Sequence, residues 1–120
     1  LSAAFAAKDL DAVLDTFTHG AEPTYSGSET RETATGHAGI RGLLTTLFAR
    51  PCTYRFVFEH VQASRFRDVI HVVAEGTGHE APGDSPPGGV EFAYRVAGAL
   101  LLESDRWRWL LVAGSEPTPI

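Results

Sequence analysis

A change of hydrophobic period at Pro51 is the feature of this 120-residue chain that most limits how it can fold. In Gly36–Arg50, apolar side chains recur three, four, seven and eight positions after Ile40, the stripe of a helix packed on a core. In Thr53–Val61, apolar and polar residues instead alternate with a period of two, as in a half-buried strand. This order predicts an α+β domain, with helices before Pro51 and an antiparallel sheet after it.

The first fifty residues are expected to hold helices and one short strand. Residues 1–17 place apolar side chains along one side of a helix, but Lys8 and Asp9 interrupt that run, and Asp9 is a suitable N-cap. We therefore expect either two short helices there or one helix that is kinked at Asp9. A short strand at Thr24–Ser26 and a further helix over Gly36–Arg50 are expected to follow.

Strands and turns are expected over the rest of the chain. Apolar runs bounded by glycine, proline, serine and aspartate are typical of strands joined by tight connections. The expected strands are Thr53–Val61, Val69–His79, Val90–Glu103 and Arg106–Ala113, with a loop at Pro82–Gly89 and a tight turn at Ser104–Asp105.

The composition indicates one globular domain over residues 1–120, because a hydrophobic content of 43% supplies a core. The ten Lys and Arg residues are scattered and the net charge is −5, so nucleic acid is not an expected partner. No apolar run approaches the roughly 20 residues that cross a bilayer, so no membrane partner is expected. The single cysteine, Cys52, excludes an intrachain disulfide and favours a cytoplasmic location with a buried thiol.

The last two expected strands are apolar on both faces. Within Val90–Leu102, large apolar side chains occupy one face of the expected strand, and alanines and Leu101 occupy the other. Residues 107–112 also carry apolar side chains on both faces. Three short helices cover only one face of a sheet, and a large exposed apolar patch usually marks an interface. We therefore expect a homodimer that forms through the sheet.

Three stretches of the chain carry a resemblance to a known family: AFAAKDLDAVLDTF from Ala4, GHAGIR from Gly36, and DRWRWLLVAGSEP from Asp105. Together with the order of elements, they resemble the SnoaL-like branch of the NTF2-like superfamily, which includes polyketide cyclases and ketosteroid isomerase. The resemblance implies a cone-shaped fold, in which three N-terminal helices pack on a curved, mainly antiparallel sheet around an open-ended apolar pocket.

The same resemblance implies two classes of function. One is a pocket that binds a hydrophobic small molecule, with cofactor-free cyclase, isomerase or hydrolase activity. The other is a non-catalytic ligand-binding or dimerisation module. By register with Gly36 and Ile40, the base of ketosteroid isomerase falls near Tyr25 or Ser26, neither of which is a carboxylic acid. This argues against that isomerase mechanism and leaves open whether the chain is an enzyme.

Candidate residues for the pocket wall come from five of the expected elements. His71 shares a strand face with Glu75, but about 13 Å separates residues four apart on a strand. His71 is therefore either a pocket residue with a partner on another strand or a structural or exposed residue. His60 is expected on the face of Phe56 and Phe58, at the pocket mouth or on an exposed rim. The full candidate set for ligand binding is Tyr25, His60, His71, Arg95, Trp107 and Trp109.

The other candidates also have structural alternatives. Arg95, inside an apolar strand, either binds an anionic ligand group or pairs with a neighbouring glutamate, and pairing is favoured. Trp107 and Trp109 either stack on a planar ligand or pack in the core. Tyr25 either donates to a ligand oxygen or anchors a turn. The five histidines lack the spacing of a metal site, so no metal is expected. The family resemblance implies chemistry without a cofactor.

Overall fold

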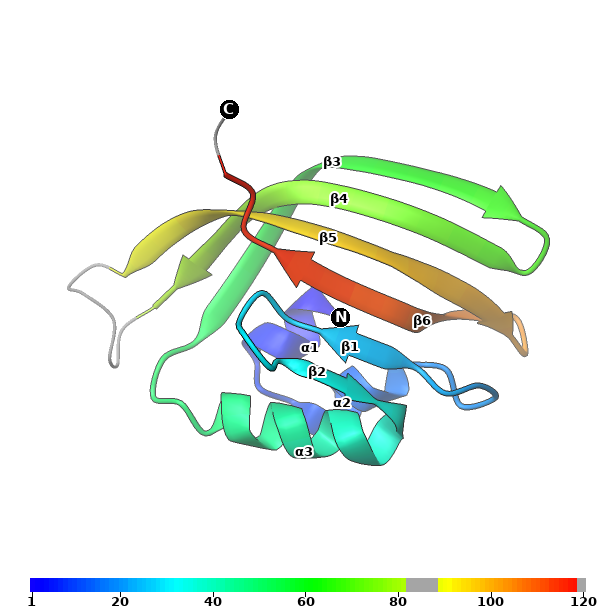
Figure 1. Cartoon of the computed structure of the whole chain (residues 1–120), viewed down its shortest axis with the longest axis horizontal. Helices are drawn as coiled ribbons and strands as arrows, with labels where there is room; N and C mark the ends of the chain where they lie inside the picture. The colour runs from blue at the N-terminus through cyan, green and yellow to red at the C-terminus, as the bar shows by residue number, and fades with distance from the viewer. Residues whose placement is uncertain (82–88, 119–120) are drawn as a thin grey trace.

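The computed structural model describes residues 1–81 and 89–118 as three helices and one six-stranded sheet (Figure 1). The helices are α1 (Ser2–Ala6), α2 (Leu10–Asp15) and α3 (Gly36–Phe48). The strands are β1 (Thr24–Ser26), β2 (Thr33–Thr35), β3 (Tyr54–Phe66), β4 (Val69–Glu80), β5 (Val90–Glu103) and β6 (Arg106–Ser115). The expected α+β class is therefore confirmed. Within the described ranges, no helix is long and apolar enough to cross a membrane.

The break in the first helical segment has a local cause. Lys8 adopts a positive φ of 55°, which a continuous helix does not tolerate. Asp9 then caps α2, because its Oδ1 accepts a hydrogen bond from the backbone N–H of Ala12 at 3.1 Å. Of the two alternatives, two short helices is the one that the chain adopts.

The sheet is open and mixed, with strand order β2-β1-β6-β5-β4-β3. Strands β3 to β6 form the expected antiparallel series, whereas β1 pairs in parallel with β6. The β5–β6 turn holds Ser104 and Asp105 at φ of 47° and 65°, the left-handed pair typical of a tight hairpin turn. Strand β2 was not predicted, since its three residues are too short and polar to show a period. Of the predicted loop at Pro82–Gly89, residues 82–88 lie outside the described residues.

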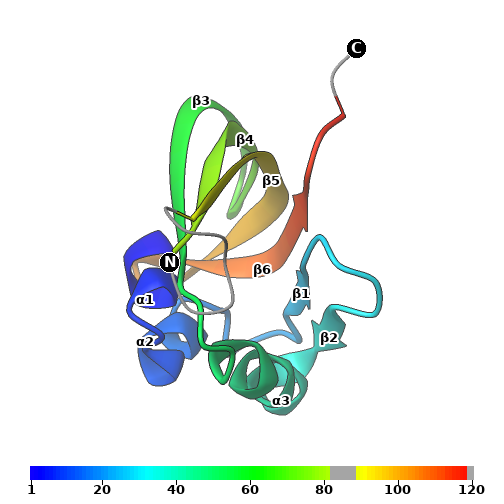
Figure 2. The ribbon, with the colours of Figure 1, turned by 90° about the vertical axis from the view of Figure 1, so that its left-hand side faces the viewer.

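All three helices lie on one side of the sheet, as Figure 2 shows. We call this side the inner face; it carries Ala74, Tyr94 and Val112, which are all buried. The opposite or outer face carries Val73, which precedes Ala74 on β4. Between the helices and the inner face lies the core, whose buried members are Phe5, Val13, Leu14, Phe17, Tyr25, Ile40, Leu44, Leu47 and Val112.

Candidate functional site

A cleft opens between the inner face of the sheet and the helices, and it has two adjoining parts. The apolar part, which we call the chamber, has a volume of about 340 Å³. The polar part, which we call the mouth, has a volume of about 230 Å³. Both parts share four aromatic lining residues: Phe5, Tyr25, Phe56 and Tyr94.

The chamber is lined by residues of β1, β3, β4, β5 and β6 together with α1. Its wall consists mostly of apolar side chains, among them Phe58, Val72, Ala74, Val96, Trp109 and Val112. Glycines on the inner face make room for the aromatic rings beside it. A Cβ on Gly78 would lie 2.4 Å from the ring of Phe92, and one on Gly114 would lie 2.0 Å from the hydroxyl of Tyr94. The rings therefore lie across the sheet only because these positions lack side chains.

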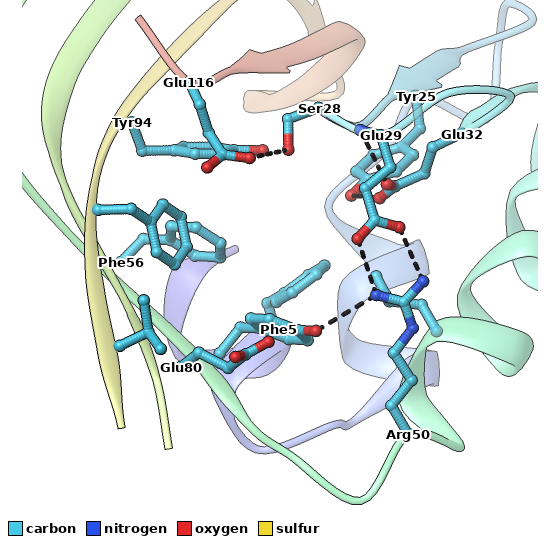
Figure 3. A pocket seen from close by; sticks show the side chains of 14 residues that line it. Phe5, Tyr25, Ser28, Glu29, Glu32, Arg50, Phe56, Glu80, Tyr94 and Glu116 are labelled. Carbon is cyan, nitrogen blue, oxygen red and sulfur yellow. Dashed lines mark hydrogen bonds and ion pairs between the residues drawn. The ribbon is translucent and has the colours of Figure 1, made fainter. Parts of the chain in front are cut away.

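The mouth contrasts with the chamber because charged groups line it (Figure 3). Four carboxylates and one guanidinium are found among its described lining residues. The carboxylates come from the loop between β1 and β2, from the end of β4, and from the segment after β6, and they belong to Glu29, Glu32, Glu80 and Glu116.

Glu32 is placed at the border between chamber and mouth by two hydrogen bonds. The hydroxyl of Tyr25 donates to Oε1 of Glu32 at 3.4 Å, and the backbone N–H of Glu29 donates to Oε2 at 3.3 Å. Burial is the largest effect and raises the pKa of Glu32. The hydrogen bond from the Glu29 backbone lowers this pKa in part, the Glu29 carboxylate raises it, and the hydrogen bond from Tyr25 lowers it, with a net rise. A carboxyl group with such a pKa can exchange protons near neutral pH more readily than an ordinary glutamate.

Arg50 holds Glu29 through a bidentate ion pair. Its Nη1 and Nη2 lie 3.0 Å and 2.7 Å from the two carboxylate oxygens, and Nη1 also donates to the hydroxyl of Tyr54 at 3.2 Å. The hydrogen bond from Arg50 lowers the pKa of Glu29. Glu29 therefore stays ionised beside Glu32, which strengthens the difference between the two carboxyl groups.

Tyr25 and Tyr94, which both face the cleft, keep their hydroxyl protons because their pKa values are raised. Burial raises the pKa of Tyr25, and the nearby Glu32 carboxylate raises it further. Burial also raises the pKa of Tyr94, as do the negative charges of Glu32, Glu116 and Glu29. On the same side of the mouth, Ser28 Oγ donates to Glu116 Oε2 at 3.2 Å.

Comparison with known proteins assigns the family. The sequence profile of the SnoaL-like domain matches residues 1–109. The chain belongs to the SnoaL-like domain family. The resemblance in the sequence is thereby confirmed, and the comparison with curated proteins gives no match.

Solved structures share the fold of this SnoaL-like domain at low sequence identity. A proposed dehydratase of the NTF2-like family from Streptomyces avermitilis superposes with a TM-score of 0.83 and 12% identity, over 98% of this chain and 88% of that one. ActVI-ORFA from Streptomyces coelicolor gives 0.78 and 18%, over 96% and 87%. A proposed scytalone dehydratase from Novosphingobium aromaticivorans gives 0.82 and 8%, over 98% and 76%. These likenesses show the NTF2-like fold and no specific activity.

Two of the candidate residues line the cleft of this SnoaL-like domain. Tyr25 contacts both chamber and mouth, and Trp109 contacts the chamber. Trp107 pairs with Leu102 as Trp109 pairs with Leu100, so the two tryptophans share the inner face as expected. Trp107 does not line the chamber; the guanidinium of Arg65 lies over its ring, with Cζ 5.1 Å from the centroid.

The other three candidates lie on the outer face. His60 was expected beside Phe58, but a bulge at Glu59 pairs Phe58 with Gly76 and His60 with Glu75. Because Glu75 and Gly76 are consecutive on β4, Phe58 and His60 point to opposite faces, and the predicted shared face was wrong.

Arg95 and His71 also point away from Tyr25. Arg95 pairs with Glu75, its Nε lying 3.3 Å from Oε1, which is the structural alternative favoured for it. His71 pairs with Ser64 and Ala99 on the outer face and is exposed. His71 and Arg95 therefore do not line the cleft with Tyr25.

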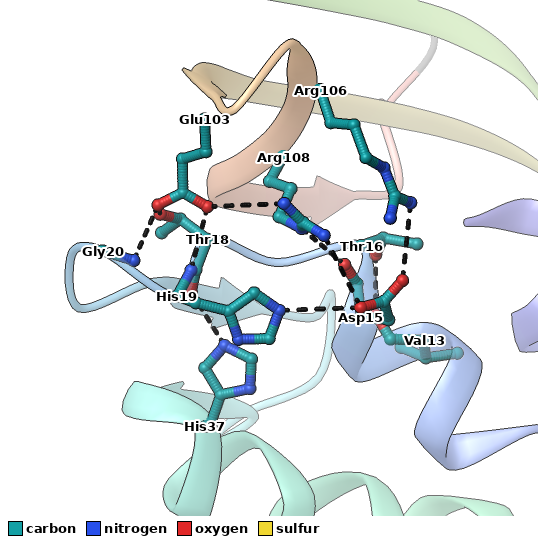
Figure 4. Close-up of polar contacts among 10 residues, drawn as sticks. All are labelled: Val13, Asp15, Thr16, Thr18, His19, Gly20, His37, Glu103, Arg106 and Arg108. Carbon is teal, nitrogen blue, oxygen red and sulfur yellow. Dashed lines mark hydrogen bonds and ion pairs between the residues drawn. The ribbon is translucent and has the colours of Figure 1, made fainter.

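A second polar cluster lies outside the cleft and joins α2 to the β5–β6 hairpin (Figure 4). The hydroxyl of Thr18 and the backbone N–H groups of His19 and Gly20 donate to the carboxylate of Glu103. These hydrogen bonds, with that of Thr18 first, lower the pKa of Glu103 to about 2. The cluster binds one backbone segment to a hairpin, which is a structural role.

Sequence reasoning missed the charged residues of the mouth. Glu29 and Glu32 lie in a polar loop without period, and Arg50 lies at the end of α3, so no local spacing relates them. The one available signal was the density of acidic residues around Tyr25. Among the described residues, no group of three or more His, Cys, Asp or Glu side chains is placed to hold a metal ion.

Proposed function

We propose that this SnoaL-like domain binds a hydrophobic small molecule in the cleft and transfers a proton at the polar end of that molecule, without a cofactor. The observation that carries the proposal is the hydrogen bond between Tyr25 and Glu32 at the border of chamber and mouth. The apolar chamber accommodates the body of the ligand, and the border places a carboxyl group of raised pKa beside it.

The proposed chemistry is general acid–base catalysis of the cyclase, isomerase or hydrolase kind. As a base, the Glu32 carboxylate takes a proton from a carbon or oxygen of the ligand, or in hydrolysis from the attacking water, and becomes the neutral acid. As that acid, it returns the proton to a second atom, so that the enzyme ends unchanged. Tyr25 remains protonated throughout and orients the carboxyl group through its hydroxyl.

Binding is tested by filling the chamber. Ala74 is buried and lines the chamber, whereas Ala93 is exposed on the outer face of the sheet. Calorimetric titration with 1-naphthalenemethanol is expected to show binding to the wild type and to Ala93→Phe. Ala74→Phe is expected to lose it, because the added ring occupies the chamber. Equal binding by both variants would contradict a site in the cleft.

Proton transfer is tested with a bound ketone. In deuterated buffer, the wild type is expected to accelerate hydrogen–deuterium exchange of the methyl group of 1-acetonaphthone, followed by NMR. Glu32→Gln is expected to lose this acceleration, since an amide cannot accept the proton. The exposed Glu59→Gln is the matched control. Exchange by Glu32→Gln at the wild-type rate would leave only the non-catalytic ligand-binding alternative.

A homodimer through the sheet is a second proposal, which applies whether or not the domain is catalytic. Val57, Val73 and Leu111 lie on the outer face and are exposed to 42%, 40% and 39%. The helices cover only the inner face (Figure 2). Exposed apolar side chains on an uncovered sheet face favour an interface between two copies of the chain.

A further inference from the structure

The charge and the aromatic lining of the mouth point to the class of ligand, and this inference rests on the proposed binding function of the cleft. We infer that the ligand is an organic cation, an ammonium group on an apolar or aromatic body, with the body in the chamber and the ammonium group in the mouth.

The mouth has an excess of negative charge that its own cation does not neutralise. Arg50 is already paired with Glu29 through two contacts of 2.7 Å and 3.0 Å. The remaining carboxylates among the described lining residues are Glu32, Glu80 and Glu116. Each of them accepts a side-chain hydrogen bond from a neutral group. Glu32 accepts from the Tyr25 hydroxyl, Glu80 from the Cys52 thiol at 3.8 Å, and Glu116 from the Ser28 hydroxyl. A cation that enters the mouth therefore meets carboxylates whose charge is not yet compensated.

Aromatic rings provide the second element of a cation site. The ring centroid of Tyr94 lies 4.7 Å from that of Phe56 and 6.0 Å from that of Phe92. Phe92 stands nearly perpendicular to both, with interplanar angles of 80° to Phe56 and 75° to Tyr94. Because the three rings lie in different planes, they present both faces and edges to the mouth. An ammonium ion within about 6 Å of a ring face is attracted by that ring.

Other ligand charges fit the mouth less well. An anionic group would lie beside the carboxylates, with the guanidinium of Arg50 already occupied by Glu29. Arg95, the residue proposed from the sequence to bind an anion, lies on the outer face with Glu75. Burial is the main cause of the raised pKa of Tyr94, and the negative charges of Glu32, Glu116 and Glu29 raise it further.

Three probes of nearly equal shape test the inference. They are 1-naphthylmethylamine, 1-naphthalenemethanol and 1-naphthoate, which are cationic, neutral and anionic at pH 7. Titration calorimetry in low salt is expected to show the amine binding about tenfold more tightly than the alcohol, with naphthoate weakest. The advantage of the amine is expected to shrink in about 0.5 M salt.

Two double variants distinguish the effect of the mouth carboxylates on binding from the effect of the net charge of the protein. Glu80→Gln/Glu116→Gln is expected to remove most of the preference for the amine. Glu59→Gln/Glu91→Gln changes the net charge equally at exposed residues that do not line the mouth, and is expected to keep the preference.

The outcomes separate this inference from the function on which it rests. Binding of the alcohol or of naphthoate as tightly as the amine would overturn the cation inference and leave the binding function standing. Equal loss of preference in both double variants would also overturn it. Absence of binding by all three probes would overturn the proposed function, and the inference with it.

Discussion

The hydroxyl of Tyr25 donates to Glu32 across 3.4 Å, and this contact links the buried centre of β1 to the loop that carries Glu29 and Glu32. The hydrogen bond stabilises the ionised form of Glu32 and so opposes the effect of burial on its pKa. The two residues thus determine together how readily the carboxyl group at this border gains or loses a proton.

Replacement of Tyr25 by phenylalanine is expected to raise the pKa of Glu32 further. The variant removes the donor that favours the carboxylate, while the ring still fills its place in the core. The carboxyl carbon of Glu32, followed by NMR over a pH series, reports the change. Tyr54→Phe is the control, because the Tyr54 hydroxyl contacts Arg50 and Cys52. A lower pKa of Glu32 in Tyr25→Phe would contradict the assigned contact.

Replacement of Arg50 by methionine is expected to raise the pKa of Glu29 toward the ordinary glutamate range. In the wild type this pKa is lowered, so the pair stabilises the fold above the ordinary glutamate pKa and ceases to do so as the pH falls through the folded value. Because both partners are about half exposed, we expect a loss of at most about 1 kcal/mol at pH 7. The loss should vanish in strong acid.

Urea unfolding at pH 7 and at pH 2 measures the effect of Arg50→Met. Arg41→Met provides the comparison, since Arg41 pairs with Asp11 at 2.9 Å on the outside of the helices. NMR titration of Glu29 is expected to shift only in Arg50→Met. An unchanged Glu29 titration in that variant would show that the bidentate pair is not formed in solution.

Glu103→Gln is expected to destabilise the fold relative to the wild type, and this loss of stability should be larger at neutral pH than in strong acid. The pKa of Glu103 is lowered to about 2, so its contribution is present above the ordinary glutamate pKa and is lost as the pH falls through about 2. The variant should therefore have a clearly lower Tm at pH 7 and nearly the wild-type Tm at pH 2. A pH-independent difference would argue against the hydrogen bonds from Thr18, His19 and Gly20.

The sequence was sufficient for the helices and long strands because each has a regular period. Ile40 and the apolar residues that follow it at helical spacing lie on the face of α3 that enters the core. The same period failed at Glu59, where one extra residue exchanges the two faces of β3. The alternation of apolar and polar residues does not reveal a bulge, so His60 was assigned to the wrong side of the sheet.

The candidate site was harder to predict because its parts are distant in the chain. Glu29 and Arg50 are separated by 21 positions and belong to a loop and a helix end. Trp109 was predictable as an aromatic candidate, but both faces of β6 are apolar, so parity did not decide which face enters the core. Loop carboxylates become a site only through tertiary contacts, which periodicity does not describe.

Two glycine substitutions are expected to change stability in opposite directions. A Cβ on Gly76 would lie 1.9 Å from the carbonyl oxygen of Val57 on the neighbouring strand, and backbone cannot move aside cheaply. Gly76→Ala should therefore cost about 1–3 kcal/mol of unfolding free energy. Gly42→Ala in α3 meets no atom within 4 Å and should stabilise by about 0.5–1 kcal/mol. Urea unfolding of the two variants measures both signs.

Charges placed on the outer face are expected to separate the proposed homodimer. The wild type should have twice the mass of the chain in light scattering at micromolar concentration, because Val73 and Leu111 would be buried between two copies. Val73→Lys/Leu111→Lys should be monomeric, since two unpaired ammonium groups per subunit would have to enter the interface. Val61→Lys is the control: Val61 is 60% exposed but lies at the edge of the chamber, on the inner face. A monomeric wild type, or dissociation by Val61→Lys alone, would exclude the outer face as the interface.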